Sequence, residues 1–451
     1  MTAAFCLWLG LFPLLHGGSY SHLTHDKWIA MLILSGVTLL CFLADACMRR
    51  LARPRIAPVL FAAGLLLCTA FSCFFCGYPP EIWWEGLSAR WEGLATELVY
   101  FGLFFLFSFS RVSLRPAVYS AFAGLCGYLV IVFLQRAGGN PFNLYPYGTS
   151  YALNPEFQGT IGNVDMVTGY GVLLAALFLG QGLALLQKNV RLRRQTALPD
   201  QPETANSSGE NASPGQTGTP SFCRANLIEL IICALGFALS VYLVLSMEVQ
   251  FGLISLGFLA LITVLRVLPR RFRLPLLILL LVLALIVVWF WPGQGGGLWE
   301  LHEILHGRTQ LSFGSNRVAV WLYSLRLSGE KPLLGGGSGT FQIRFNQYLE
   351  NNSLTIPKSQ NGVLLPHYFD NPHNMYIAQL TDHGIPAMLL FLALVLSPLM
   401  GRKKTGKSSV PGLYTVLTYG VQAFFSFSVC MVSPLFWVLL GDSAQRNAEE
   451  T

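Results

Sequence analysis

Charge is scarce in this sequence. Only 11% of the 451 residues are charged and 53% are hydrophobic, whereas a soluble protein carries about 25% charged residues. A composition this apolar argues against a soluble globular protein and indicates a membrane protein. The net charge of +7 is spread along the chain instead of gathering on one face or tail, which argues against a nucleic-acid-binding surface.

Cysteine is absent from the two longest loops that we place outside the membrane, residues 135–163 and 292–372. Nine of the ten cysteines lie in or at the ends of apolar stretches, and Cys223 lies in a polar loop. This excludes a disulfide framework in the two loops. The apolar stretch 1–15 also lacks the basic residues and the cleavage site of a signal peptide, so we predict a first spanning helix there.

Apolar stretches recur along nearly the whole chain, and at roughly 18 residues or more most are long enough to cross a bilayer. The further predicted spans are 28–48, 56–76, 94–110, 116–134, 164–187, 225–245, 250–268, 275–291, 373–400 and 411–431. The last apolar segment, 411–440, contains Pro434 and is too long for one helix and too short for two, so we expect one span and a short or re-entrant segment. The predicted fold is a single all-α polytopic membrane domain with about 11–12 transmembrane helices.

Basic residues fall in every second loop between these stretches. The clusters lie at 49–55, 111–115, 188–194 with Arg224, 266–273 and 402–407. Because loops rich in Lys and Arg stay in the cytoplasm, we predict a cytoplasmic N-terminus in a cytoplasmic (inner) membrane and an extracytoplasmic active site. Residues 195–221 fall on the cytoplasmic side, and their Ser, Gly, Pro, Thr and Asn predict a disordered linker.

The extracytoplasmic loop 292–372 is too long to be structureless in a compact protein. We predict short helices at 298–306, 316–328 and 341–350, the second ending at Gly329. Such amphipathic helices are expected to lie along the membrane surface and to cover a cavity between the spans.

Residues 370–374 read Asp-Asn-Pro-His-Asn directly before a predicted span. Asn is a favoured N-cap and Pro a favoured first helical residue, so His373 and Asn374 are expected in the first helical turn. The positive end of that helix attracts phosphate and keeps His373 neutral and able to accept a proton. The alternative is that this run only caps a span.

Two residues interrupt the same span farther along. Gly384 and Pro386 predict a break, and broken helices at membrane depth line cavities. Asp382 lies beside the break and is either functional or part of a structural pair.

Three arginines of the 292–372 loop are candidates for binding a diphosphate, because the planar guanidinium binds two oxygens at once. They are Arg317, Arg326 and Arg344. The alternative for each is a solvated surface charge.

Two further patterns are weaker. Residues 302–306 read His-Glu-Ile-Leu-His, which fits a zinc-protease pattern, but no third ligand follows. Residues 335–340 read Gly-Gly-Gly-Ser-Gly-Thr, which is similar to a phosphate loop without its Lys and more consistent with a tight connector between helices.

Several segments in order resemble the O-antigen ligase and polysaccharide polymerase family of membrane glycosyltransferases. They are 159–163 (Gly-Thr-Ile-Gly-Asn), 315–317 (Ser-Asn-Arg) with Trp321, 331–337 (Lys-Pro-Leu-Leu-Gly-Gly-Gly), 373–374 (His-Asn), 384–387 (Gly-Ile-Pro-Ala) and 419–425 (Tyr-Gly-Val-Gln-Ala-Phe-Phe). The last Gly of the ligases' His-Asn…Gly-x-x-Gly pattern is Ala387 here.

The resemblance implies roles for individual residues. His373 corresponds to the family's essential loop histidine and Arg317 to the arginine that meets the donor diphosphate. Many members carry a Ser-Arg pair where this chain has Val249 and Gln250. Arg326 or Arg344 would then supply the missing cation. We also assign Asn374 and Gln250 to the diphosphate site and Asp370, Asp382 and Gly384 to supporting positions.

The family is known to transfer glycans from a polyprenyl (undecaprenyl) diphosphate carrier without a metal, so the resemblance implies no cofactor and no metal ligands. The expected partners are this donor, a glycan or other cell-envelope acceptor, and the bilayer, but not nucleic acid. Whether the protein is a ligase or a polymerase stays open. One alternative is a transporter or flippase of lipid-linked polysaccharide, which predicts inverted repeats that the sequence lacks. A second is an intramembrane metalloprotease, which rests on residues 302–306 alone.

Overall fold

The long apolar stretches form helices in the computed structural model, which describes residues 1–87, 90–196, 224–360, 363–366, 369–400 and 409–445. In these ranges eight helices are long and apolar enough to cross a membrane. They are α2 (Leu23–Cys47), α3 (Ile56–Phe75), α6 (Leu114–Arg136), α7 (Val164–Thr196), α8 (Arg224–Ser246), α9 (Gln250–Val267), α10 (Arg270–Trp289) and α14 (Met375–Leu396). The predicted all-helical, polytopic membrane fold is confirmed.

Shorter helices complete the structure. They are α1 (Thr2–Cys6) with η1 (Leu7–Leu11) and η2 (Phe12–Leu14), α4 (Pro80–Glu85), α5 (Leu94–Ser108), η3 (Pro141–Asn143), α11 (Gly296–Leu305), α12 (Arg317–Ser328), α13 (Phe341–Asn351), η4 (Ser397–Leu399), α15 (Val410–Ala423) and α16 (Ser433–Ser443). Two small antiparallel pairs, β1 (Phe157–Gln158) with β2 (Gly162–Asn163) and β3 (Pro357–Gln360) with β4 (Val363–Pro366), were not predicted.

The last apolar segment differs from the prediction of one span and a short segment. It forms two short helices, α15 and α16, with Pro434 in the first turn of the second, where proline fits a helix. Both helices are buried, and Trp437 of α16 packs against Phe101 and Tyr100 of α5. The predicted total of eleven or twelve spans includes such short helices and remains a prediction. The predicted linker 195–221 lies, apart from its first two residues, outside the described ranges.

Buried polar contacts join helices at the end of the bundle that holds the basic clusters. Arg55 donates hydrogen bonds to the carbonyl oxygens of Ser397 and Ser443, both at 2.9 Å. Arg115 binds the buried carboxylate of Glu229 at 2.6 Å. Some of these basic residues therefore hold the fold together in addition to any effect on orientation.

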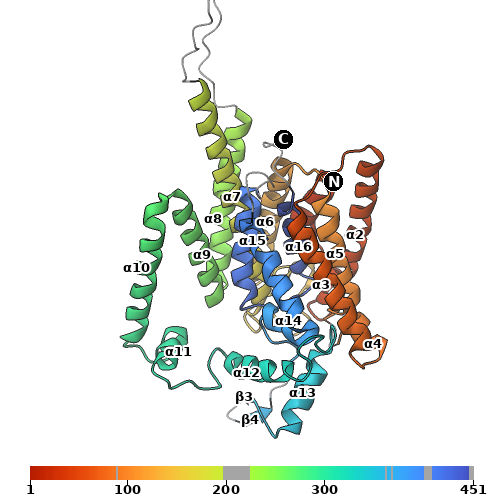
Figure 1. The fold of residues 1–451 in the computed structure, drawn as a ribbon, viewed down its shortest axis with the longest axis vertical. Coiled ribbons are helices and arrows are strands. Elements are labelled where there is room, and N and C mark those ends of the chain that lie inside the picture. The colour runs from red at the N-terminus through yellow and green to blue at the C-terminus, as the bar shows by residue number, and fades with distance from the viewer. Residues whose placement is uncertain (88–89, 197–223, 361–362, 367–368, 401–408, 446–451) are drawn as a thin grey trace, which may run out of the picture.

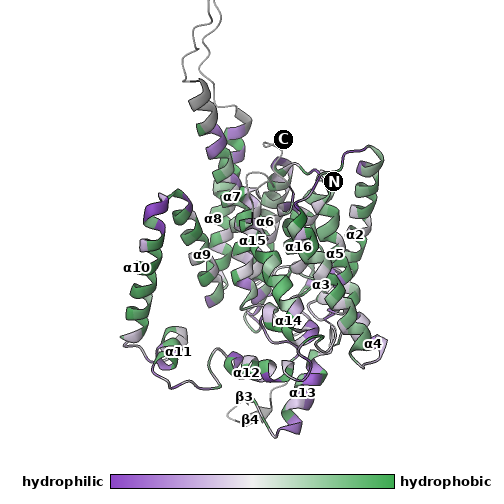
Figure 2. Ribbon diagram, viewed as in Figure 1, coloured by the Kyte–Doolittle hydropathy of each residue, from purple (hydrophilic) through white to green (hydrophobic). Residues whose placement is uncertain are grey.

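The 292–372 loop covers the opposite end of the bundle. Its helices α11, α12 and α13 lie within two residues of their predicted bounds, and α12 and α13 lie across the end of α14 (Figure 1). Apolar side chains of α12 and α13, including Tyr323, Phe341 and Phe345, pack together in a small core of their own. Figure 2 shows the long helices as mainly hydrophobic and α13 as largely hydrophilic.

Candidate active site

The first turn of α14 differs in detail from the prediction. The N-cap is Asn374, whose side-chain oxygen accepts hydrogen bonds from the backbone N–H groups of Tyr376 and Ile377 at 2.9 and 3.1 Å. The side chain of Asn371 instead accepts from the backbone N–H of His373 at 2.8 Å and closes a turn. His373 has a φ of 51°, outside the helical region. The helix therefore begins after His373, and Asn374 caps it.

Asn374 is consequently buried rather than exposed to a ligand. Its side chain is fully shielded from solvent, and its amide nitrogen has no hydrogen-bond partner among the described residues. Its position supports α14 and does not favour the predicted role in binding diphosphate.

A backbone contact favours one tautomer of the His373 imidazole. Nδ1 lies 3.3 Å from the carbonyl oxygen of Asn371, and because a carbonyl only accepts, Nδ1 carries the proton and Nε2 keeps a free lone pair. The ring lies edge-to-face against Phe369 and Phe427. The pKa of His373 is lowered to about 4, chiefly by burial and in addition by the charge of Arg317, and Asp370 opposes the shift. His373 is therefore neutral, mainly because its partly buried ring is shielded from water.

His373 faces a cavity of about 680 Å³. The cavity lies where α2, α7 and α14 begin, and its lining comes from segments far apart in the sequence. Among the described residues that line it are His22, His25, Arg90, Asp165, Asp370 and His373. Its mixture of imidazole, guanidinium and carboxylate groups suits a polar, charged ligand.

Arg317 is the first residue of α12 and lies next to this cavity. A guanidinium nitrogen lies 3.8 Å from a carboxylate oxygen of Asp165, which lines the cavity. The guanidinium also stacks over the ring of Phe251 at 5.0 Å, which orients its plane. Since the charge of Arg317 acts on His373, the two residues singled out as catalytic lie at one site.

The other predicted diphosphate ligands lie elsewhere. Arg326 follows Arg317 by about two and a half helical turns, so it is on the opposite face of α12, where it is exposed and lies over Tyr323. Gln250 is exposed at the start of α9 and lies against Gly297 of α11. Neither lines the cavity.

Arg344 is engaged in a structural pair. A guanidinium nitrogen lies 2.6 Å from the carboxylate of Asp382, and Nε donates to the hydroxyl of Thr340 at 2.8 Å. The side chain is 9% exposed. Asp382 therefore takes the structural alternative, and Arg344 is not available to a diphosphate in the cavity.

The predicted break in α14 is present at Gly384, which has φ 85°. The connector 335–339 docks into it: the N–H groups of Gly336 and Gly337 donate to the carbonyl oxygens of Thr381 and Asp382 at 3.1 and 2.8 Å. A Cβ on Gly384 would lie 2.2 Å from the carbonyl oxygen of Leu333, so only glycine fits. The N–H groups of Gly336 and Gly337 are thus used within the protein, which favours the connector over a phosphate loop.

Sequence reasoning missed three residues of the site: Arg90, Asp165 and Phe427. Arg90 forms an ion pair with Asp370 and stacks over Phe427 at 4.6 Å. The available signal for Arg90 was an arginine in a loop predicted to be extracytoplasmic, where basic residues are few. Asp165 is an acidic residue at the start of an apolar stretch. Phe427, which lies between α15 and α16, carried no signal.

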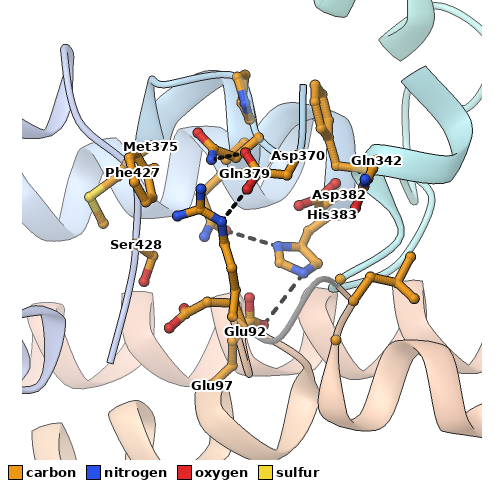
Figure 3. Close-up of a pocket in the computed structure, with 18 residues that line it drawn as sticks. Glu92, Glu97, Gln342, Asp370, Met375, Gln379, Asp382, His383, Phe427 and Ser428 are labelled. Carbon is orange, nitrogen blue, oxygen red and sulfur yellow. Dashed lines mark hydrogen bonds and ion pairs between the residues drawn. The ribbon is translucent and has the colours of Figure 1, made fainter. Parts of the chain in front are cut away.

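Arg90, Asp370 and Phe427 also line a second, smaller chamber of about 90 Å³. Figure 3 shows His383 pointing into it between Gln379 and Glu97. A ring nitrogen of His383 lies 3.0 Å from Gln379, and the other lies 3.5 Å from Glu97. The ion pair of Arg90 with Asp370 therefore stands between two polar chambers.

The His-Glu-Ile-Leu-His run lies on α11, away from the cavity. Nδ1 of His302 faces the carbonyl oxygen of Val288 at 3.0 Å, and Nδ1 of His306 faces that of His302 at 2.8 Å. Glu303 pairs with Arg308 at 2.7 Å. In the part of the chain that the structure describes, no three His, Cys, Asp or Glu side chains gather as metal ligands.

Residues 235–392 match the model of the family described as O-antigen ligase. The matched stretch runs from within α8 into α14 and contains Arg317 and His373, whereas Arg90, Asp165 and Phe427 lie outside it. No curated protein matches the chain. The family match confirms the resemblance that the sequence motifs indicated.

Proposed function

We propose that this multi-pass membrane protein, whose residues 235–392 match the O-antigen ligase family model, is a glycosyltransferase. It would transfer a glycan from a polyprenyl diphosphate carrier to an acceptor hydroxyl in the cavity beside His373. One arrangement carries this proposal. A neutral histidine with a free Nε2 faces a polar cavity. Arg90 lines this cavity, and Arg317 lies beside it and contacts Asp165 of its lining.

In the proposed reaction, the acceptor oxygen bonds to the anomeric carbon of the donor as the bond from that carbon to the diphosphate breaks. The diphosphate leaves with the bonding electron pair, and Nε2 of His373 takes the hydroxyl proton. Arg317 and Arg90 stabilise the charge that develops on the diphosphate. The carboxylate of Asp370 stabilises the imidazolium, since it already favours the charged form of His373.

The pH dependence of the free enzyme follows from the lowered pKa of His373. His373 acts as a base only when unprotonated, and its pKa is lowered from 6.5 to about 4. As the pH falls, kcat/KM should therefore stay flat through 6.5 and decline only near pH 4. Between pH 6.5 and about pH 4 the unfolded chain binds a proton at this histidine and the native chain does not. The free energy of unfolding should therefore also decrease as the pH falls from 6.5 to about 4. Initial rates at low donor concentration measure the profile, and a half-loss near pH 6.5 in a protein that stays folded contradicts it.

We further propose that the cavity faces away from the cytoplasm. The helices α2, α5 and α7 begin at the cavity end. The basic clusters 49–55 and 111–115 follow the far ends of α2 and α5, and the cluster 188–194 lies in the far part of α7. This arrangement supports the orientation because basic segments stay in the cytoplasm. A cysteine introduced at Glu350 of α13 should react with a membrane-impermeant thiol reagent in intact cells. Labelling only after lysis contradicts the orientation.

The proposed reaction is tested with purified protein in detergent micelles, polyprenyl diphosphate-linked oligosaccharide and a glycan acceptor. Micelles have no second compartment, so a transporter produces no chemical change there. Formation of the transferred glycan together with free polyprenyl diphosphate supports the proposal. Recovery of unchanged donor with acceptors of several sugar classes contradicts it.

A further inference from the structure

An apolar groove runs between α2 and α5, which lie side by side at the edge of the bundle (Figure 1). Its volume is about 480 Å³. The described residues that line it are almost all apolar and include Leu32, Leu39 and Phe42 of α2 and Leu103 and Leu106 of α5. From Leu32 to Phe42 the groove follows α2 for about 15 Å, roughly half the hydrocarbon core of a bilayer.

On α2 the groove begins about two helical turns from the cavity beside His373. His25 and Trp91 line the cavity, and Trp28, the next residue on the same face of α2, stacks on Trp91 with ring centroids 4.8 Å apart. Trp28 also donates its indole N–H to Thr96 of α5 at 2.8 Å. Leu32, the first groove residue of α2, is one turn farther. The same two segments thus line a polar cavity at one end and an apolar groove below it.

Two glycines keep the groove empty. A Cβ added to Gly36 of α2 or to Gly102 of α5 would meet no atom within 4 Å. Glycines on neighbouring helices more often allow the backbones to touch. Here they leave open space in the wall of the bundle, where a larger side chain at either position would fill the groove without displacing protein atoms.

We propose that this groove holds the polyprenyl tail of the donor while the diphosphate occupies the cavity beside His373. The inference rests on the proposed function. It commits to this occupant because the groove is apolar and elongated and lies on the same helix, α2, whose start lines the polar cavity. A lipid with a charged head and a long isoprenoid chain requires such a pair of neighbouring sites. Bulk lipid tails are as apolar as the groove, so the groove acts by guiding the tail and setting the position of the diphosphate.

Filling the groove tests the inference. Gly36→Leu and Gly102→Leu each place a side chain in it, and Gly257→Leu is the matched control, because a Cβ on Gly257 of α9 also meets no atom within 4 Å but lies outside the groove. KM is measured for a long-chain polyprenyl diphosphate oligosaccharide and for an analogue with two isoprene units. We expect Gly36→Leu and Gly102→Leu to raise KM for the long-chain donor about tenfold, because the displaced tail no longer sets the position of the diphosphate. KM for the short analogue should change little.

The outcomes separate the groove from the reaction. If the groove variants change KM equally for both donors, or if Gly257→Leu has the same selective effect, the groove does not hold the tail although the reaction stands. If the wild-type protein transfers glycan from neither donor, the proposed function fails. Activity of the groove variants on the short analogue shows that they are folded, so a selective loss cannot come from misfolding.

Discussion

Replacing His373 with Asn will lower glycan transfer by about 10²–10⁴-fold, the usual contribution of a general base. Asn is the suitable substitution because it readily adopts the positive φ of 51° found at this position, so the turn before α14 is kept. It removes the free Nε2 and supplies no base. Donor affinity should change much less than turnover, because the proposed ligands of the diphosphate are the side chains of Arg317 and Arg90.

His25 provides the control for this substitution. It lines the same cavity, but its side chain is 49% exposed and lies 3.7 Å from the carboxylate of Asp26. His25→Asn should retain most of the turnover at equal membrane abundance. A large loss of turnover in His25→Asn, together with normal turnover in His373→Asn, would assign the base to His25.

Replacing Arg317 with Lys will lower kcat/KM by about 10–100-fold, although the positive charge is kept. A charge-assisted hydrogen bond is worth roughly 1.5–3 kcal/mol, and lysine cannot reproduce the planar pair of donors. Lysine also loses the flat stacking of the guanidinium on Phe251. The defect should appear in donor affinity as well as in turnover, which distinguishes Arg317 from His373.

Arg326→Lys is the matched control, since Arg326 lies on the same helix but is exposed on its other face. Its kinetics should equal those of the wild type. Wild-type donor affinity in Arg317→Lys, or an equal loss in Arg326→Lys, removes Arg317 from the diphosphate site.

Features encoded by neighbouring residues could be predicted from the sequence. The helices α11, α12 and α13 follow from amphipathic spacing and local stop signals, and the break at Gly384 follows from a glycine and a proline within one turn. His373 and Arg317 stood out because they belong to an ordered set of motifs. The structure places His373 in the lining of the cavity and Arg317 beside it, against Asp165.

Features decided by distant contacts could not be predicted. The sequence made Arg344 a candidate diphosphate ligand, but its guanidinium pairs with Asp382, which is 38 residues away. Arg90 reaches Asp370 across 280 residues, and no local pattern encodes that pairing. The N-cap of α14 was misplaced because Asn371 and Asn374 both suit the position, and only the positive φ of His373 decides between them.

The most direct measurement of the central claim is single-turnover cleavage of a polyprenyl diphosphate-linked oligosaccharide, with donor binding measured on the same preparations. The wild-type protein should release polyprenyl diphosphate as each glycan bond forms. His373→Asn should bind the donor with nearly unchanged affinity and release almost none. Near wild-type release by His373→Asn, at equal protein abundance, contradicts the claim that His373 is the catalytic base and leaves it only as part of the turn before α14.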